Sequence, residues 1–281
     1  MTYKAMEIKL PEVKDLDIDK ILVDYTVDIK KPFKYPPQLL SIIEGEKKFH
    51  IMHRGSFSAI KGQSKGRKTT LMSMASAAFC NQNNPVLMTF QANIYQDELC
   101  IYFDTEQADY ECHRFVNIIH KLAGNLDNFI MLRLRPFSPE ERFEIIQKVI
   151  EKYKDRIVIV IIDGVLDLVS EMNSERESTE ITTWLLKVTE LLNIHITVII
   201  HENWGTEKAS GHIGSSILRR AETVISVNLH KKDKNFSVVK CDRMRGKWFE
   251  SFIIGINHED MPFILVTEQT KTKNKSEDPP F

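Results

Sequence analysis

Hydrophobic and polar positions change their spacing several times along the chain, and each change marks a different expected element. Residues 157–162 (IVIVII) are all apolar and β-branched, a pattern typical of a strand buried on both faces of a parallel sheet. Between residues 108 and 122, apolar positions recur every three or four residues, which predicts a helix with one buried face. Strand and helix patterns alternate in this way over most of the chain, so an α/β fold is expected.

Five strands and their connecting helices predict the parallel part of one sheet. The expected strands are residues 56–60, 99–103, 129–133, 157–162 and 196–200, and the expected helices are residues 69–81, 108–122, 138–153 and 181–191. Ser138 and Glu141 have capping-box spacing at the start of the third helix. Strands 224–229, 236–241, 249–254 and 263–267 follow with only turns between them, which indicates antiparallel pairing. The predicted fold is doubly wound, with a mainly parallel sheet and an antiparallel C-terminal extension.

Three regions are expected along the chain. Residues 1–50 carry repeated charges and a proline cluster, and we expect an arm or linker there that packs on the main body, with a short helix near residues 38–43. Residues 51–270 are expected to form one α/β domain. Residues 271–281 are rich in lysine, aspartate and proline, so a disordered tail is expected.

Composition excludes several classes of protein. The 281 residues include 38 lysines and arginines against 39 aspartates and glutamates, a net charge of −1, which excludes a strongly basic coat that binds nucleic acid by net charge alone. The four cysteines lack the spacing of a disulfide framework or a metal site, so reduced thiols in a cytoplasmic protein are expected. No apolar run reaches the ~18 residues of a membrane span, and we expect no membrane partner.

A phosphate-binding loop is expected between the strand at 56–60 and the helix at 69–81. Glycines there would let the backbone wrap a phosphate with its N–H groups, and the helix N-terminus would add a favourable dipole. Lys68 would reach the β- and γ-phosphates, and the Thr69 hydroxyl would ligate Mg²⁺. The expected nucleotide-binding residues are Gly62, Gln63, Ser64, Lys65, Gly66, Arg67, Lys68, Thr69 and Thr70.

This loop departs from the GxxxxGK[ST] pattern at one position. Arg67 stands where the pattern has its second glycine, and Gly66 comes one residue early. Arg67 either contacts phosphate itself or strains the loop. A basic turn without a nucleotide is the alternative for the whole segment, although the flanking strand and helix favour a phosphate loop.

Polar side chains follow three of the buried strands. They are Asp104-Thr105-Glu106, Asp163 and His201-Glu202-Asn203. Ligands of an open parallel sheet bind beyond the carboxyl ends of its strands, so we expect a site there; capping or solvated turn residues are the alternative for any one of them. Asp163 would hold Mg²⁺ through its water shell. Glu106 would orient and deprotonate an attacking water. His201 or Asn203 would sense the γ-phosphate.

The order of these motifs resembles that of the RecA-like P-loop ATPases. Residues 102–106 (YFDTE) are similar to the strand end that carries the catalytic glutamate in that family. A closer resemblance is to the hexameric RepA-type replicative helicases of plasmids and mobile elements, through the phosphate loop and residues 201–218. The resemblance covers residues 55–254. It implies a RecA-like fold, ATP and Mg²⁺ as ligands, self-assembly into a ring or filament with a hexamer expected, and action on DNA in replication or mobilisation.

The resemblance also implies residues that act on a neighbouring subunit or on nucleic acid. A basic finger delivered in trans would be Arg245, with Arg243 second and Lys240 third; a solvated basic hairpin turn is the alternative. Channel-facing segments that contact single-stranded DNA would be residues 171–178 and 205–212. Neither is strongly basic, and a mobile lid is equally compatible with them.

Two functions of different classes follow. The first is a Mg²⁺-dependent ATPase that acts as an oligomer on DNA, as in a helicase, with replication or mobilisation proteins as candidate partners. The second is a nucleotide-dependent switch or assembly ATPase, KaiC-like or loader-like, that recruits a protein partner without translocating. A kinase on the same loop is a third option without an acceptor-substrate signature.

Overall fold

The computed structural model describes residues 17–32, 34–81, 84–171, 173–202 and 211–265. Over these residues, one large sheet consists of β3 (Ser56–Gly62), β5 (Leu99–Asp104), β6 (Phe129–Arg133), β7 (Ile157–Asp163), β8 (His195–His201), β9 (Thr223–Leu229), β10 (Phe236–Met244), β11 (Phe252–Ile256) and β12 (Pro262–Leu265). The helices are α1 (Ile18–Tyr25), α2 (Lys68–Cys80), α3 (Asp109–Ala123), α4 (Pro139–Lys152), α5 (Glu175–Leu192) and α6 (Gly211–Arg220), with a short 3₁₀ helix η1 (Val165–Leu168).

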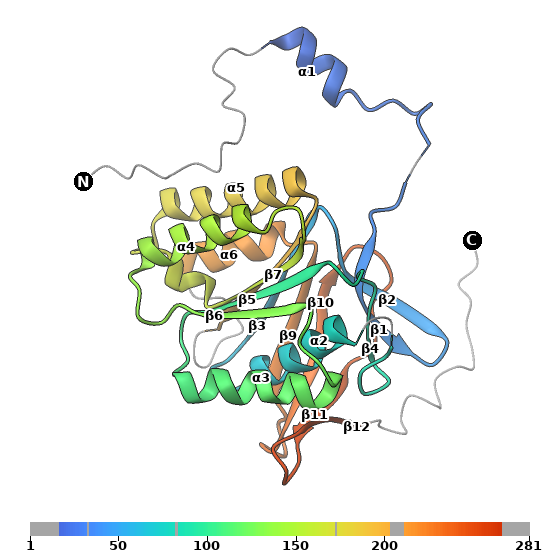
Figure 1. Cartoon of the computed structure of the whole chain (residues 1–281), viewed down its shortest axis with the longest axis vertical. Coiled ribbons are helices and arrows are strands. Elements are labelled where there is room, and N and C mark those ends of the chain that lie inside the picture. Colours follow the sequence, from blue (N-terminus) through green and yellow to red (C-terminus); the bar gives the residue numbers. More distant parts are fainter. Residues whose placement is uncertain (1–16, 33, 82–83, 172, 203–210, 266–281) are drawn as a thin grey trace.

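The large sheet has the order β12-β11-β10-β9-β3-β8-β7-β5-β6 (Figure 1). The strands from β9 to β6 pair in parallel, and β10, β11 and β12 extend the sheet by antiparallel pairing. The α/β fold with a mainly parallel sheet and an antiparallel C-terminal extension is therefore confirmed. β3 lies at the centre of this order, between β9 and β8.

Helices cover both faces of the large sheet (Figure 1). Side chains of α2 and α3 belong to the core on one face, and side chains of α4, α5 and α6 belong to the core on the other. Strand β7 shows why its sequence is apolar throughout: Ile159 and Ile161 pack on the α2 face, and Val160 and Ile162 pack on the α5 face. A parallel strand covered on both sides has no solvent face that a polar residue could occupy.

The predicted capping box is confirmed at the start of α4. The Glu141 backbone N–H donates to Ser138 Oγ at 3.3 Å, and the Ser138 N–H donates to Glu141 Oε2 at 2.9 Å. Pro139 occupies the first turn, where its missing N–H costs no hydrogen bond. The local sequence thus fixes where this helix begins.

The helix expected near residues 38–43 is wrong, because the segment is a strand. β1 (Gln38–Glu44), β2 (Lys47–His53) and β4 (Phe90–Ala92) form a smaller sheet in the order β2-β1-β4. A two-residue turn joins β1 to β2, with Glu44 opposite Lys47 and a φ of +58° at Gly45. Gly45, which suits a tight turn, is the sequence signal from which the hairpin could have been predicted. The expected boundary at residue 50 falls inside β2.

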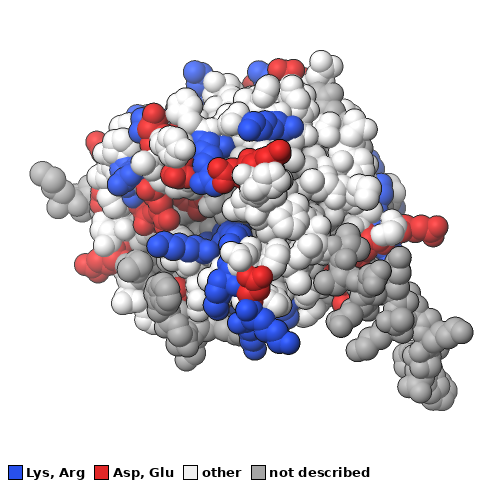
Figure 2. Space-filling view, turned by 90° about the horizontal axis from the view of Figure 1, so that it is seen from below, with Lys and Arg blue, Asp and Glu red and all other residues white. Residues whose placement is uncertain are grey.

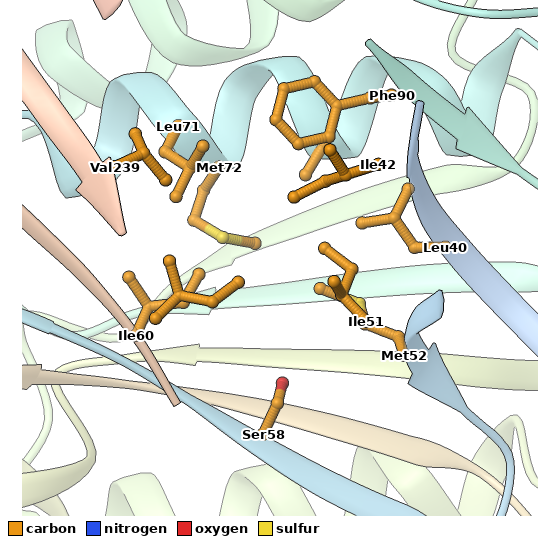
Figure 3. Close-up of a pocket in the computed structure, with 12 residues that line it drawn as sticks. Leu40, Ile42, Ile51, Met52, Ser58, Ile60, Leu71, Met72, Phe90 and Val239 are labelled. Carbon is orange, nitrogen blue, oxygen red and sulfur yellow. The ribbon is translucent and has the colours of Figure 1, made fainter. Parts of the chain in front are cut away.

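The smaller sheet packs on α2 and completes the core of that face. Figure 3 shows Leu40 of β1 and Phe90 of β4 among the side chains that face Met72 of α2 and Ile60 of β3. The space left between them is only about 10 Å³, less than one water needs. This close packing makes residues 38–53 part of the main body.

Truncation tests this assignment. A chain that begins at Gln38 should unfold at the same urea concentration as the full chain, because no side chain of α1 in the described structure is buried. A chain that begins at Ile51 loses four buried apolar side chains, those of Leu39, Leu40, Ile42 and Phe49. At ~1.5–3 kcal/mol each, their loss should remove roughly 6 kcal/mol or more, most of a domain's usual stability. Equal midpoints for the two truncated chains would contradict the assignment.

Candidate nucleotide and metal site

The predicted phosphate loop lies between β3 and α2, at the carboxyl end of the central strand. Two glycines let it pack against β9. A Cβ on Gly62 would lie 2.1 Å from the Val227 carbonyl oxygen, and a Cβ on Gly66 would lie 2.8 Å from the same atom. Because neither space admits a side chain, the backbone of the loop is held close to β9.

Lys68 opens α2 and is a buried residue, at 5% exposure. Nζ donates to the carbonyl oxygens of Gly62 at 2.9 Å and Gln63 at 3.0 Å, and lies 3.0 Å from His201 Nδ1. Burial lowers the pKa of Lys68, and the nearby carboxylates of Asp163 and Glu106 oppose this shift. A desolvated cation beside a phosphate-sized loop favours an anionic ligand.

Three strand ends meet beside this lysine. β5, β7 and β8 are neighbours in the sheet, and Asp104 lies opposite Asp163 in the parallel register. Their polar side chains line one cavity of about 710 Å³ together with the phosphate loop. The expected site residues that line it are Ser64, Lys65, Gly66, Arg67, Lys68, Thr69, Thr70, Glu106, Asp163 and His201. A cavity of this size is typical of a small-molecule site.

The surface around the opening carries charges of both signs. On the face shown in Figure 2, lysine and arginine side chains and acidic side chains lie interspersed around a hollow near the centre. Phosphate groups with a bound divalent cation combine the same two signs of charge, so basic and acidic side chains are both needed in such a site.

His201 links Lys68 to Glu106. Its Nε2 lies 2.8 Å from Glu106 Oε1, and its Nδ1 lies 3.0 Å from Lys68 Nζ. Because the ammonium can only donate, Nδ1 accepts from Lys68, and Nε2 lies on the side of the ring next to the carboxylate. This contact with His201 is the main cause that lowers the pKa of Glu106, against the effect of burial. Glu106 is thus held as an anion at the edge of the cavity.

Asp163 is 5% exposed and lies at the floor of the cavity. Its Oδ2 accepts a hydrogen bond from the Tyr102 hydroxyl at 2.6 Å. Burial raises the pKa of Asp163 to about 7, and the carboxylate of Asp104 adds to the shift. A carboxylate in this state gains from a bound cation. Thr69 lines the same cavity, so the two residues expected to hold Mg²⁺ share one space.

Asp104 was expected at this edge of the sheet as part of the YFDTE segment, but the sequence assigned it no role of its own. Its Oδ1 accepts from the backbone N–H groups of Glu106 at 3.0 Å and Gln107 at 2.7 Å. Oδ2 is buried and has no hydrogen-bond partner within the described part of the chain. Burial raises the pKa of Asp104, against these two hydrogen bonds. Asp104 therefore shapes the turn that presents Glu106.

A network of charged side chains around Lys61 of β3 was also not predicted from the sequence. Lys61 Nζ lies 2.7 Å from Glu202 Oε1 and 3.0 Å from Asp242 Oδ2. Burial lowers the pKa of Lys61, but hydrogen bonds to both carboxylates outweigh it and the net pKa is raised. The Glu202 N–H also donates to the Gly62 carbonyl at 3.1 Å. These contacts tie the ends of β3, β8 and β10 together beneath the phosphate loop.

Two of the candidate finger residues, Arg243 and Arg245, lie toward the other end of β3. Arg243 pairs in register with Val224 near the start of β9, and β9 runs parallel to β3, so Arg243 is near the edge where β3 begins. Its Nη1 donates to the carbonyls of Leu218 at 3.0 Å and Arg219 at 2.9 Å, at the end of α6. Lys68 follows the other end of β3. Within one chain, the two groups are not brought together.

Some of the other residues predicted to contact a neighbouring subunit or DNA lie within the described structure. Arg245 Nε lies 3.9 Å from Glu222 Oε1, and Lys240 Nζ lies 3.5 Å from Asp242 Oδ1. In the first segment expected to contact DNA, Arg176 Nε donates to Glu180 Oε1 at 2.8 Å. Asn203 and nearly all of segment 205–212 lie outside the described residues, as does the expected tail at 271–281.

A scan against protein-family models and a search of curated proteins found no match to this chain. In the described ranges, every helix is too short or too polar to cross a membrane. No cluster of three or more histidine, cysteine, aspartate or glutamate side chains suited to a metal ion occurs in the described part either. The function is therefore inferred from the geometry of the cavity.

The burial of Asp163 predicts a pH effect on stability. Its pKa rises from 3.8 in the unfolded chain to about 7 in the fold, so the folded state binds more protons and stability falls as pH rises from 4 to 7. At pH 8, Asp163→Asn should therefore have a higher free energy of unfolding than the wild type, by at most roughly 4 kcal/mol from urea denaturation. Near pH 4 the two proteins should have the same stability. The exposed Asp155→Asn controls for a lost negative charge. A pH-independent difference would contradict the account.

Proposed function

We propose that the protein is a Mg²⁺-dependent ATPase of RecA-like fold that acts as an oligomer on DNA. The convergence of Lys68, Glu106, Asp163 and His201 on one cavity beside a glycine-containing loop is the observation that supports it. Nucleotide triphosphate hydrolysis needs a cradle for phosphates, a cation site and a base for water, and these residues offer one candidate for each.

Binding begins at the loop between β3 and α2. The backbone N–H groups of the loop and the start of α2 favour the phosphates, since N–H groups at a helix N-terminus and the helix dipole both attract anions. Lys68 would exchange the carbonyls of Gly62 and Gln63 for phosphate oxygens. The Thr69 hydroxyl and the Asp163 carboxylate would hold Mg²⁺, which supplies charge neutralisation at the β- and γ-phosphates when bound.

Hydrolysis would then depend on Glu106 as the general base. Glu106 accepts a proton from the water that attacks the γ-phosphorus, as the bond between that phosphorus and the β–γ bridging oxygen breaks. His201 holds the Glu106 carboxylate through Nε2 and Lys68 through Nδ1. A movement of Lys68 toward phosphate therefore changes the partner of His201, which fits a sensor of the bound nucleotide.

Assembly into a ring or filament would supply the finger. Arg243 and Arg245 lie toward the start of β3, Arg245 beside Glu222, whose N–H donates to the Phe57 carbonyl, so a neighbouring copy would have to present either one. An arginine delivered in this way stabilises charge that develops on the γ-phosphate.

One observation favours the second candidate, a nucleotide-dependent switch or assembly ATPase that recruits a protein partner. The described part of segment 171–178 carries Glu171, Glu175 and Glu177, and Arg176 is already paired with Glu180. Tracking of a phosphate backbone needs clustered unpaired lysine or arginine, which this segment lacks among its described residues.

Lys68→Ala tests the site itself. The variant should lose ATP hydrolysis by at least ~100-fold, because it removes the lysine at the start of α2 that would contact the β- and γ-phosphates. Released phosphate measures the effect, and Lys187→Ala, which removes an exposed lysine of α5, is the control. Turnover by Lys68→Ala at the wild-type rate would refute the proposed site.

Glu106→Gln separates binding from chemistry. The amide cannot take a proton from water, so hydrolysis should fall ~100-fold or more while ATP affinity stays within a few-fold of wild type. Calorimetry gives the affinity and phosphate release gives the rate. A rate near that of wild type would remove Glu106 from the proposed role.

Single-stranded DNA distinguishes the two candidate functions. An ATPase that acts on DNA should hydrolyse ATP several-fold faster with single-stranded DNA, and the DNA affinity should fall steeply as salt rises. A switch should show no stimulation but should change its oligomeric mass when ATP is added. Phosphate release and mass measurement under the same conditions decide between them.

A further inference from the structure

Arg67 holds a backbone conformation that glycine favours. Its φ of +68° and ψ of 29° are left-handed, at the position where the phosphate-loop pattern has its second glycine. A residue with a Cβ pays a steric penalty in this conformation that glycine avoids. The loop therefore has the backbone geometry of a glycine at a position occupied by arginine. Contacts of the arginine side chain must offset the steric cost of this conformation.

The Arg67 guanidinium is bound by the β9–β10 hairpin. Nη1 donates to Ser237 Oγ at 3.1 Å, and Nη2 donates to the Lys234 carbonyl oxygen at 2.9 Å. One side chain thus joins the phosphate loop to a segment about 170 residues later in the sequence. Two donors in the fixed geometry of a guanidinium restrict the position of the loop more than one flexible contact would.

The hairpin is an ordered support for this contact. The His230 N–H donates to the Phe236 carbonyl at 2.9 Å, and the Phe236 N–H donates to the Asp233 carbonyl at 3.2 Å. Ser237 is fully buried and lies opposite Leu229 in the β9–β10 ladder. Val227 of the same hairpin closes over Gly62 and Gly66. The loop is therefore held on one side by close backbone packing and on the other by Arg67.

We propose that Arg67 is a positioning residue that clamps the phosphate loop to the β9–β10 hairpin, so that the loop amides are arranged for a triphosphate before it binds. The inference depends on the proposed nucleotide site. The sequence left two alternatives for Arg67, direct contact with phosphate or strain in the loop, and the clamp is a third. A clamp of this kind lowers the ordering cost of binding, so its loss weakens affinity.

Arg67→Gly removes the clamp and relieves the backbone at the same time. If Arg67 only strains the loop, this variant should bind Mg·ATP as tightly as wild type or more tightly. If Arg67 is a clamp, affinity should fall about tenfold, and KM should rise by a larger factor than kcat falls. Met88→Gly is the matched control, because Met88 is an exposed residue with a φ of +55° outside the site.

Ser237→Ala tests the same contact from the hairpin. It should weaken Mg·ATP binding about threefold in the Arg67 protein and have no further effect in Arg67→Gly, because the two residues share one hydrogen bond. Arg67→Lys should fall between wild type and Arg67→Gly, since an ammonium keeps the charge without the paired donors.

The outcomes separate the inference from the proposed function. Weaker binding by Arg67→Gly, with Met88→Gly unchanged and no added effect of Ser237→Ala, supports the clamp. Binding by Arg67→Gly equal to wild type, or additive effects of the two substitutions, overturns it. Absence of ATP binding by the wild type overturns the proposed function. Thermal melting then tests the contact alone: Ser237→Ala should lower Tm in the Arg67 protein and not in Arg67→Gly.

Discussion

A buried ammonium group organises the whole edge of the sheet where the cavity lies. Lys68 lies at the start of α2, and its partners come from the ends of two strands: the carbonyls of Gly62 and Gln63 at the end of β3 and the imidazole of His201 at the end of β8. His201 extends the chain of contacts to Glu106 beyond β5. A desolvated cation is stable only when acceptors surround it, so these segments must stay together whenever Lys68 stays buried.

The same constraint explains the chemistry available to the cavity. Two neutral carbonyls and an imidazole are modest partners for an ammonium group, and an anionic oxygen would be a stronger one. The two nearby carboxyl groups have pKa values that are shifted in opposite directions. Glu106 is kept ionised by His201, whereas burial raises the pKa of Asp163. An arrangement of one cation, one exposed base and one buried carboxyl group matches what a triphosphate with a divalent ion requires.

Support for this edge comes from elements that lie far away in the sequence. The Lys61–Glu202–Asp242 network fixes the strand ends on one face, and the smaller sheet with α2 fills the other. Arg67 and Val227 attach the phosphate loop to the β9–β10 hairpin. Changes in β9 and β10 therefore reach the loop through direct contacts.

The sequence predicted those features that repeat locally. Apolar runs such as residues 157–162 mark buried strands, Ser138 with Glu141 marks a helix start, and polar residues directly after strands mark the sheet edge. Residues 38–43 were predicted wrongly because a short, mostly apolar segment does not distinguish a strand from a helix turn, and Gly45 was the sequence signal that could have indicated the hairpin. Lys61 and Asp242 could not be paired from the sequence, since their contact depends on the β3-β9-β10 order. The partner of Arg67 depends on the same tertiary placement.

A structure determined with Mg²⁺ and a non-hydrolysable ATP analogue tests the central claim most directly. We expect the triphosphate against the amides of residues 63–69, with Lys68 Nζ moved from the Gly62 and Gln63 carbonyls to phosphate oxygens, and with Glu106 and Asp163 beside the terminal phosphate. A nucleotide bound elsewhere while Lys68 keeps its carbonyl and His201 contacts would contradict the account.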